Sequence, residues 1–228
     1  MKLYHHLKEA KFLSRPNRFI AMCQVDGEAT VCHVKNTGRC KELLLPGATV
    51  WLEESDNPAR KTRFDLVAVE SRGYTVNMDS QAPNRIFAEW AGSGGYLSGL
   101  TALKAETTYG TSRFDFSYRL GDQQGFVEIK GVTLFDEAGM AYFPDAPTDR
   151  GVKHIHELIA AKQAGYDAGI CFVLQRENVI GLAPNDKTHP AFGEALRQAH
   201  AAGVRITAAV CRVTPESCTI THTVPIHL

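Results

Sequence analysis

The sequence predicts a mixed α/β protein in two parts, a small β-barrel over residues 1–81 and an α/β domain over residues 82–228. Its 228 residues, of which 44% are hydrophobic and 22% charged, are enough for two small globular domains. Up to about residue 79, short runs of alternating apolar and polar residues are separated by turn residues, which is typical of strands. Beyond Ala82-Pro83-Asn84, helix-like segments alternate with hairpins and apolar runs, which is typical of helices packed on a sheet.

The barrel is expected to contain four or five short strands. The clearest runs are residues 18–25, 29–34, 48–53 and 64–70, and residues 40–45 suit a short helical turn. Asp26-Gly27, between the first two runs, is a strong signal for a tight hairpin turn. Strands of this number and length favour a closed or partly closed barrel of the OB type, and an SH3-like barrel fits nearly as well.

The α/β domain is expected to place helices on the faces of a mixed sheet. The expected elements, in order, are a helix at 85–91, a strand or poor helix at 100–108, a hairpin at 112–120 and 126–132 with a third strand at 140–143, a helix from 148 to 164, strands at 168–175 and 179–183, a helix at 191–202, and strands at 204–213 and 217–223. Thr148 is a good N-cap for the second helix, because its side-chain oxygen can accept a free backbone N–H group.

The charge balance excludes a global basic field. With 25 basic and 25 acidic residues the formal net charge is zero, so any surface that binds an anion must be local. The six cysteines show no spacing typical of zinc ligands and are expected to be reduced, buried thiols. The N-terminus lacks an apolar signal core and the longest purely apolar run, at 170–174, is too short to span a bilayer, so a cytoplasmic protein without membrane contact is expected.

The hairpin at 112–132 carries a pattern that predicts a metal site. Asp115 on one strand and Glu128 on the next can share one divalent cation, Mg²⁺ or Mn²⁺, with the backbone carbonyl of Ile129 as a further ligand. Lys130 points to the same side as Glu128, where it can orient a water molecule or stabilise charge on a phosphate. These parts predict metal-assisted phosphodiester hydrolysis, with Asp115, Glu128 and Lys130 as catalytic residues.

Two questions about this hairpin stay open. An acid and a lysine on one strand face also occur as a solvated ion pair, but the apolar neighbours of Glu128 predict burial, and charges are seldom buried without partners. Either Glu89 or Glu106 can supply a third carboxylate, and both also suit ordinary surface charges. Of these two, Glu89 on the first helix is the preferred candidate ligand.

Local groups of positive charge predict contacts with the phosphates of DNA. They lie in loops rich in Gly, Asn and Pro, where the backbone can approach phosphates closely, although solvated loop charges explain them about as well. At the start of the helix that follows Thr148, the free amides and the dipole add to two more basic residues. The candidate DNA-binding residues are Arg15, Arg18, Asn36, Arg39, Lys41, Arg60, Lys61, Arg113, Arg150 and Lys153, and His154 is a candidate for proton transfer or for a structural contact.

Five segments of the chain, at 15–19, 36–44, 57–62, 112–116 and 143–151, resemble the sugar fermentation stimulation protein A family, and the match runs over essentially the whole chain. The resemblance implies an OB-like barrel followed by a restriction-endonuclease-like domain of the PD-(D/E)XK kind. Asp115, Glu128 and Lys130 match the acid, acid and lysine of that motif, and Glu-Ile-Lys replaces the usual Glu-Val-Lys. The resemblance also implies DNA binding without sequence specificity and a regulatory link to maltose metabolism.

Three functions remain open on this basis. The first is a DNA-binding protein that keeps a metal-dependent nuclease site. The second is a DNA-binding regulator without catalysis, in which the nuclease fold is only a scaffold. The third is an enzyme that acts on another phosphodiester, such as RNA or a nucleotide.

Overall fold

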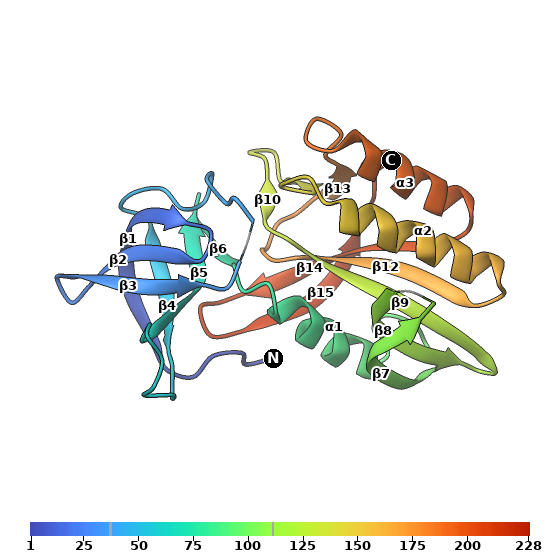
Figure 1. Cartoon of the computed structure of the whole chain (residues 1–228), viewed down its shortest axis with the longest axis horizontal. Coiled ribbons are helices and arrows are strands. Elements are labelled where there is room, and N and C mark those ends of the chain that lie inside the picture. Colours follow the sequence, from blue (N-terminus) through green and yellow to red (C-terminus); the bar gives the residue numbers. More distant parts are fainter. Residues whose placement is uncertain (37, 111) are drawn as a thin grey trace.

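The computed structural model describes residues 1–36, 38–110 and 112–228, and its N-terminal part is a β-barrel (Figure 1). Its strands are β1 (Leu7–Asn17), β2 (Ile20–Val25), β3 (Glu28–Val34), β4 (Thr49–Glu54), β5 (Phe64–Ser71) and β6 (Tyr74–Asn77). Antiparallel pairing in the order β3-β2-β1-β4-β5 is closed by a parallel pairing of β3 with β5, which completes a five-stranded ring. The predicted OB-type barrel is confirmed, and β6 extends the sheet beyond it.

Two strands of the N-terminal part, β1 in the ring and β6 beyond it, were not among the predicted runs. Strand β1 buries only Ala10 and Phe12 among its eleven residues, so it carries little apolar periodicity. It is held instead by backbone pairing with β2 on one side and β4 on the other. The predicted turn is present, because Asp26 and Gly27 both have positive φ angles, 50° and 88°, between β2 and β3.

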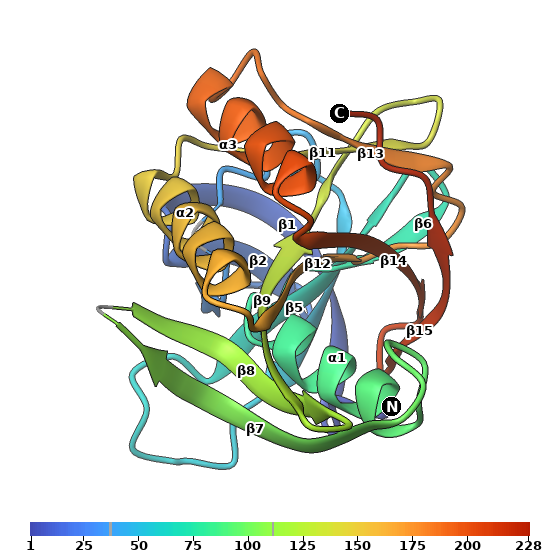
Figure 2. The ribbon, with the colours of Figure 1, turned by 90° about the vertical axis from the view of Figure 1, so that its right-hand side faces the viewer.

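The second part is an α/β domain built on a six-stranded sheet (Figure 2). The sheet order is β15 (Cys218–Val224), β14 (Arg205–Val213), β12 (Asp167–Leu174), β9 (Gln123–Val132), β8 (Ser112–Leu120) and β7 (Leu100–Tyr109). Helix α1 (Ala82–Gly92) covers one face, and α2 (Asp149–Gln163) and α3 (Pro190–Ala201) cover the other. Of the two interpretations of 100–108, the strand is correct.

The predicted third hairpin strand at 140–143 is wrong in its partners. Strand β11 (Met140–Phe143) leaves the main sheet and joins a separate small sheet. There it pairs antiparallel with β10 (Leu134–Phe135) and parallel with β13 (Gly181–Pro184). The parallel partner lies about forty residues away in sequence, and a local pattern cannot reveal such a pairing.

Alternation along β9 sends its side chains into two different cores. Phe126 and Val132 pack into the core on the side of α2, and Val127 and Ile129 pack into the core on the side of α1. Glu128 and Lys130 share the period of Phe126 and Val132 and therefore face α2. All six cysteines are buried and unpaired, and no described helix is long and apolar enough to cross a membrane.

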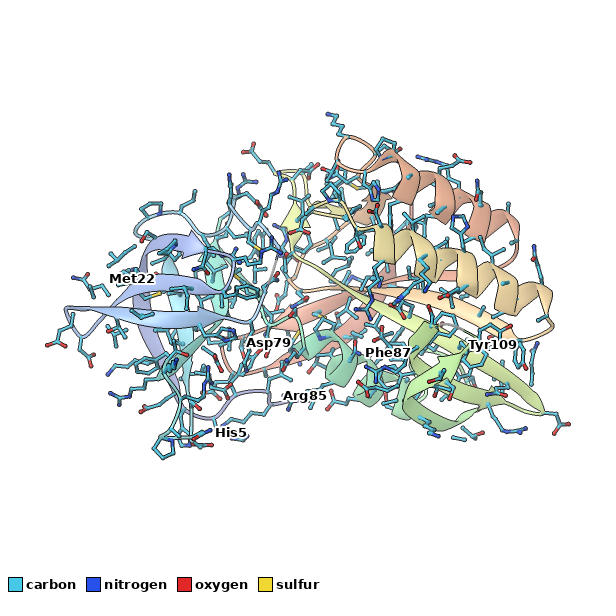
Figure 3. The ribbon with its side chains drawn as sticks, in the orientation of Figure 1. His5, Met22, Asp79, Arg85, Phe87 and Tyr109 are labelled. Atoms are coloured by element: carbon cyan, nitrogen blue, oxygen red, sulfur yellow. The ribbon has the colours of Figure 1, made fainter. Side chains whose placement is uncertain are left out.

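A buried polar network joins the two domains near Asp79 (Figure 3). The side-chain amide of Gln175, just after β12, donates to the side chain and the carbonyl of Asn77, both at 2.9 Å. The side chain of Asn77 donates to Tyr4 Oη at 2.8 Å. Lys35 Nζ lies 3.5 Å from carboxylate oxygens of both Asp65 and Asp79. Hydrogen bonds of this kind require one geometry, so the network fixes how the barrel sits against the sheet.

Candidate metal and nucleic-acid site

The site begins where β8 and β9 separate. The two strands pair from Leu120 with Gln123 as far as Phe116 with Val127. At the next residue, Asp115, a side-chain hydrogen bond takes the place of the backbone hydrogen bonds between the strands. Asp115 Oδ2 accepts the backbone N–H of Ile129 at 2.7 Å, and Oδ1 accepts the side-chain amide of Asn84 at 2.9 Å. The fork therefore holds a carboxylate between the two strands and the first turn of α1.

Glu128 is the second carboxylate, and its two oxygens have different surroundings. Oε1 accepts Lys130 Nζ at 2.7 Å and also the ring of His154 from α2. Oε2 is buried and has no hydrogen-bond partner among the described residues. A buried carboxylate oxygen without a donor is costly, because the group has lost water and gained nothing in exchange. The geometry thus presents one free oxygen of a residue that is 3% exposed.

The histidine has a defined tautomer in this arrangement. Arg150 Nε donates to His154 Nε2 at 3.4 Å, so the ring proton lies on Nδ1 and is donated to Glu128. The helix that carries both residues starts as predicted, since Thr148 Oγ1 accepts the N–H of Gly151 at 3.1 Å. The start of α2 therefore fixes the orientation of Glu128 through His154.

The two carboxylates have opposite pKa shifts. Burial, and then the charge of Glu128, raises the pKa of Asp115. Burial also opposes ionisation of Glu128, but hydrogen bonds from His154 and the charge of Lys130 outweigh it and lower the pKa of that residue. Such a pair, one acid well ionised and the other resisting a second negative charge, is typical of functional sites.

This pair fits a hard divalent cation. Mg²⁺ and Mn²⁺ bind carboxylate oxygens and keep water at their remaining positions, so two acids suffice as protein ligands. A cation would satisfy Glu128 Oε2 and remove the repulsion that raises the pKa of Asp115. No group of three or more His, Cys, Asp or Glu side chains with metal-binding geometry occurs within residues 1–36, 38–110 and 112–228.

The structure does not bring either candidate third carboxylate to the pair. Glu89, on α1, forms an ion pair with the N-terminal ammonium group at 3.0 Å. Glu106, on β7, lies 3.4 Å from Arg113, and both of these side chains are more than half exposed. Helix α1 contributes Asn84 instead, a residue that the sequence indicated only as part of a domain boundary. The carbonyl of Ile129 as a ligand stays a prediction.

Four of the predicted DNA-binding residues, Arg15, Arg18, Arg39 and Lys41, line an open groove between the domains. Arg18, Arg39 and Lys41 are exposed, and the groove, of about 440 Å³, continues over Ala146 and Pro147. Pro147 directly precedes the N-cap of α2, whose next turns carry Arg150 and His154. The groove and the carboxylate pair are therefore connected by one short segment of chain.

Arg15, although it lines the groove, and Asn36 are occupied by contacts within the fold. Arg15 donates to the backbone carbonyls of Arg18, Asn36, Gly38 and Arg39, so it organises the loop and has few donors left for phosphate. The side chain of Asn36 accepts the N–H of Gly38 at 2.8 Å, and Thr37, from the same motif, lies outside the described residues.

Arg60 also has a different role from the predicted one. It holds Asp65 through two hydrogen bonds of 2.8 and 2.6 Å, and these bonds help keep the pKa of Asp65 at about 2 although burial opposes ionisation. Lys61 is exposed, and Lys153, on α2, is exposed at 3.8 Å from Glu157. Sequence alone does not distinguish a structural arginine from an available one, because both lie in loops of the same composition.

The fold defines a class of protein, with an N-terminal OB barrel and a restriction-endonuclease-like α/β domain. Two family models match, the SfsA N-terminal OB domain over residues 13–78 and the sugar fermentation stimulation protein RE domain over residues 81–217. The chain belongs to the sugar fermentation stimulation protein (SfsA) family, as its five motifs predicted.

Relatives and one solved structure agree with this assignment. A sugar fermentation stimulation protein homolog of Desulfitobacterium hafniense strain Y51 is 52% identical over 214 residues, which are 94% of this chain and 93% of the relative. A homolog of Ruminiclostridium cellulolyticum is 50% identical over 210 residues, 92% of each chain. The structure of Pyrococcus furiosus SfsA in complex with Ca²⁺ matches 100% of this chain and 98% of its own, with a TM-score of 0.90 and 28% identity.

Proposed function

We propose that this protein binds DNA and hydrolyses phosphodiester bonds with a divalent metal ion held by Asp115 and Glu128. The observation that carries the proposal is the buried, unpaired Oε2 of Glu128 beside a second carboxylate with a raised pKa. The related Pyrococcus furiosus protein was solved in complex with Ca²⁺, which supports a site for a divalent cation in this family. Ca²⁺, Mg²⁺ and Mn²⁺ all prefer oxygen ligands.

The chain itself supplies the remaining parts of such a site. Bound Mg²⁺ or Mn²⁺ would polarise a phosphoryl oxygen and lower the pKa of a bound water. Lys130, with Nζ at 2.7 Å from Glu128 and a side chain 16% exposed, is placed to orient a water or to stabilise charge on phosphate. His154 keeps Oε1 of Glu128 engaged, so that Oε2 would be left to hold a cation.

The groove supplies a local grip on nucleic acid. Because the net charge is zero, attraction to phosphates must come from Arg18, Arg39 and Lys41 rather than from the whole surface. Contacts of this kind hold the backbone and do not identify bases, which supports binding without sequence specificity. A nucleic-acid strand that runs from the groove over Pro147 toward α2 would reach Arg150 and the carboxylates.

A cleavage assay tests the catalytic part. Purified protein is incubated with single- and double-stranded DNA and with RNA, in Mg²⁺ or Mn²⁺, beside Asp115→Asn and Lys130→Ala. We expect cleavage by the wild type and a loss of about 100-fold or more in each variant. The matched control is Asp122→Asn, in the exposed turn of the same hairpin, which should cut normally. A wild type that cuts none of these substrates contradicts the proposal, and equal cutting by all variants indicates a contaminant.

A salt titration of DNA affinity tests the proposed contacts between the groove and the phosphates. The logarithm of DNA affinity should fall steeply with the logarithm of salt concentration, and Arg39→Ala or Lys41→Ala should flatten the slope by about one unit each. Arg197→Ala is the control, because this arginine of α3 is paired with Asp186 outside the groove. A flat slope for the wild type would remove the phosphate contacts from the proposal.

A DNA-binding regulator without catalysis is the second candidate. It is favoured by the relatives' name, which refers to stimulation of sugar fermentation. A link to maltose metabolism in particular stays a prediction. Steep salt-dependent binding without cleavage of any substrate would support this candidate over the nuclease.

A further inference from the structure

Arg176 is a buried cation whose surroundings differ from those of every other buried charge in the described chain. It is 5% exposed and follows β12 at the boundary of the two domains. Its guanidinium carbon lies over two aromatic rings, 4.6 Å from the centre of Tyr74 in the barrel and 4.7 Å from that of Phe135 on β10. The N–H groups of a guanidinium point outward in its own plane, so hydrogen bonds are donated from the edge of the group.

That edge has no anionic partner in the described chain. Each of the buried carboxylates has a cation at ion-pair distance, Asp65 and Asp79 with Lys35, Glu128 with Lys130, and Asp167 with Lys162 and Arg205. Within the same residues Arg176 forms no ion pair, and its Nε has no hydrogen-bond partner. A buried charge without a partner is costly, and an unsatisfied buried donor often marks the place of a ligand or an ion.

A pocket lies against this arginine. It has a volume of about 440 Å³ and is lined by residues of the β5–β6 turn, the β10–β11 turn and the segment after β12. The two turns of the α/β domain meet closely, because a Cβ on Gly139 would lie 2.9 Å from the carbonyl oxygen of Asn178 and 3.7 Å from Arg176 Nη2. The guanidinium edge of Arg176 thus forms part of the closely packed wall of this pocket.

The acidic residues of the pocket do not neutralise Arg176. Asp136 accepts the N–H of Met140 at 2.8 Å and the hydroxyl of Tyr142 at 3.1 Å, so its oxygens are engaged within their own turn. Glu137 is 88% exposed and lies 3.5 Å from Arg72, which it offsets. Asp136 still acts on Arg176 through its charge at longer range, which favours a singly charged ligand over a multiply charged one.

We propose that this pocket is a binding site for a small oxyanion, a phosphate or carboxylate group that places two oxygens on the edge of Arg176. Bidentate recognition suits the fixed fork of an arginine, and the two rings hold that fork in position before a ligand arrives. The site involves neither the carboxylate pair nor the groove, so it stands or fails independently of the nuclease proposal. Because Tyr74 belongs to the barrel and Phe135 to the second domain, a bound anion would connect both.

The test is an NMR titration of the full chain with inorganic phosphate and, separately, with acetate, at constant ionic strength set with sodium chloride. We expect saturable shifts of the Gly139 and Asn178 amides in at least one series, and the series that saturates identifies the phosphate or the carboxylate type. Arg176→Gln should abolish them, and Arg176→Lys, which keeps the charge without the fork, should weaken them. Arg72→Ala should retain saturation, because that arginine is offset by Glu137.

Three results would overturn the proposal. The first is a wild type without saturable shifts in either series, which would leave Arg176 as a cation–π contact between the domains. The second is equal saturation in Arg176→Gln, provided that the amide of Gly27 in the barrel shows an unchanged fold. The third is loss of binding in Arg72→Ala alone, which would place the anion on the exposed arginine. The Arg176→Lys variant and the wild-type titration keep the test decisive if Arg176→Gln does not fold.

Discussion

Two buried carboxylates on neighbouring strands of one sheet, Glu128 on β9 and Asp167 on β12, differ in how completely they are satisfied. Asp167 is 4% exposed, and its oxygens accept Tyr118 at 2.7 Å, Arg205 at 2.9 Å and Lys162 at 3.2 Å. Glu128 also has two basic partners, yet within residues 1–36, 38–110 and 112–228 one of its oxygens has no donor. The sheet can therefore satisfy a buried acid fully, and the incomplete set at Glu128 supports the proposed cation site.

The largest expected effect is a difference in the free energy of unfolding between variants of Asp167 and of Glu128. Asp167→Asn removes the charge that accepts hydrogen bonds from Tyr118, Lys162 and Arg205, and we expect the free energy of unfolding to fall by about 3 kcal/mol. Glu128→Gln should change it by about 1 kcal/mol or less, since Asp115 still offsets Lys130. Urea titrations measure both, with Asp122→Asn as the surface control. Equal losses for both acids would contradict the comparison.

Metal should stabilise the protein through the unsatisfied acid. At a Mn²⁺ concentration of 100 times the dissociation constant, the free energy of unfolding should rise by about 2.7 kcal/mol, because the ion binds only the folded chain. The rise should vanish in Glu128→Gln and persist in Asp167→Asn, each compared with its own metal-free sample. Thermal unfolding monitored by circular dichroism gives the shifts. A rise that survives in Glu128→Gln would place the ion elsewhere.

His154 should act on metal affinity rather than on stability. Removing its hydrogen bond in His154→Ala lets Glu128 turn, and we expect Mn²⁺ binding, measured by electron paramagnetic resonance, to weaken by about 10- to 100-fold. His154→Gln, which can still donate an amide N–H to Glu128, should recover part of the loss. An unchanged affinity in the alanine variant would show that His154 only packs.

The smallest expected effect is on the stability of the protein at low pH. Burial opposes ionisation of Asp167, but hydrogen bonds from Tyr118 and Arg205 outweigh it and lower its pKa. A depressed folded-state pKa contributes stability above the unfolded value, about 3.9, which is lost as the pH falls through the folded value. Stability measured between pH 5 and about 2 should therefore decline less steeply in Asp167→Asn. Asp65, whose pKa is about 2, keeps part of the slope in that variant.

Much of the site was predictable from local pattern. Period-two alternation placed Glu128 and Lys130 on one face of β9, and Thr148 begins α2 as expected. Neither Asn84 nor the contact of His154 with Glu128 could be predicted, because these residues lie 31 and 26 positions from their partners. The sequence also could not show which arginines are free to bind phosphate and which are used within the fold. The carbonyls that accept hydrogen bonds from Arg15 belong to Gly38 and Asn36, more than twenty residues away, and only folding brings them together.

By itself the sequence determined which residues alternate, which turns are tight and that Glu128 would be buried, because these depend on neighbours along the chain. The tertiary structure decided what each charge meets. Among the residues that the structure describes, it left one oxygen of Glu128 without a donor and Arg176 without an ion pair, and it gave Asp167 three donors. Hydrogen bonds and ion pairs act over a few ångströms in space, so only the folded arrangement of distant strands fixes them.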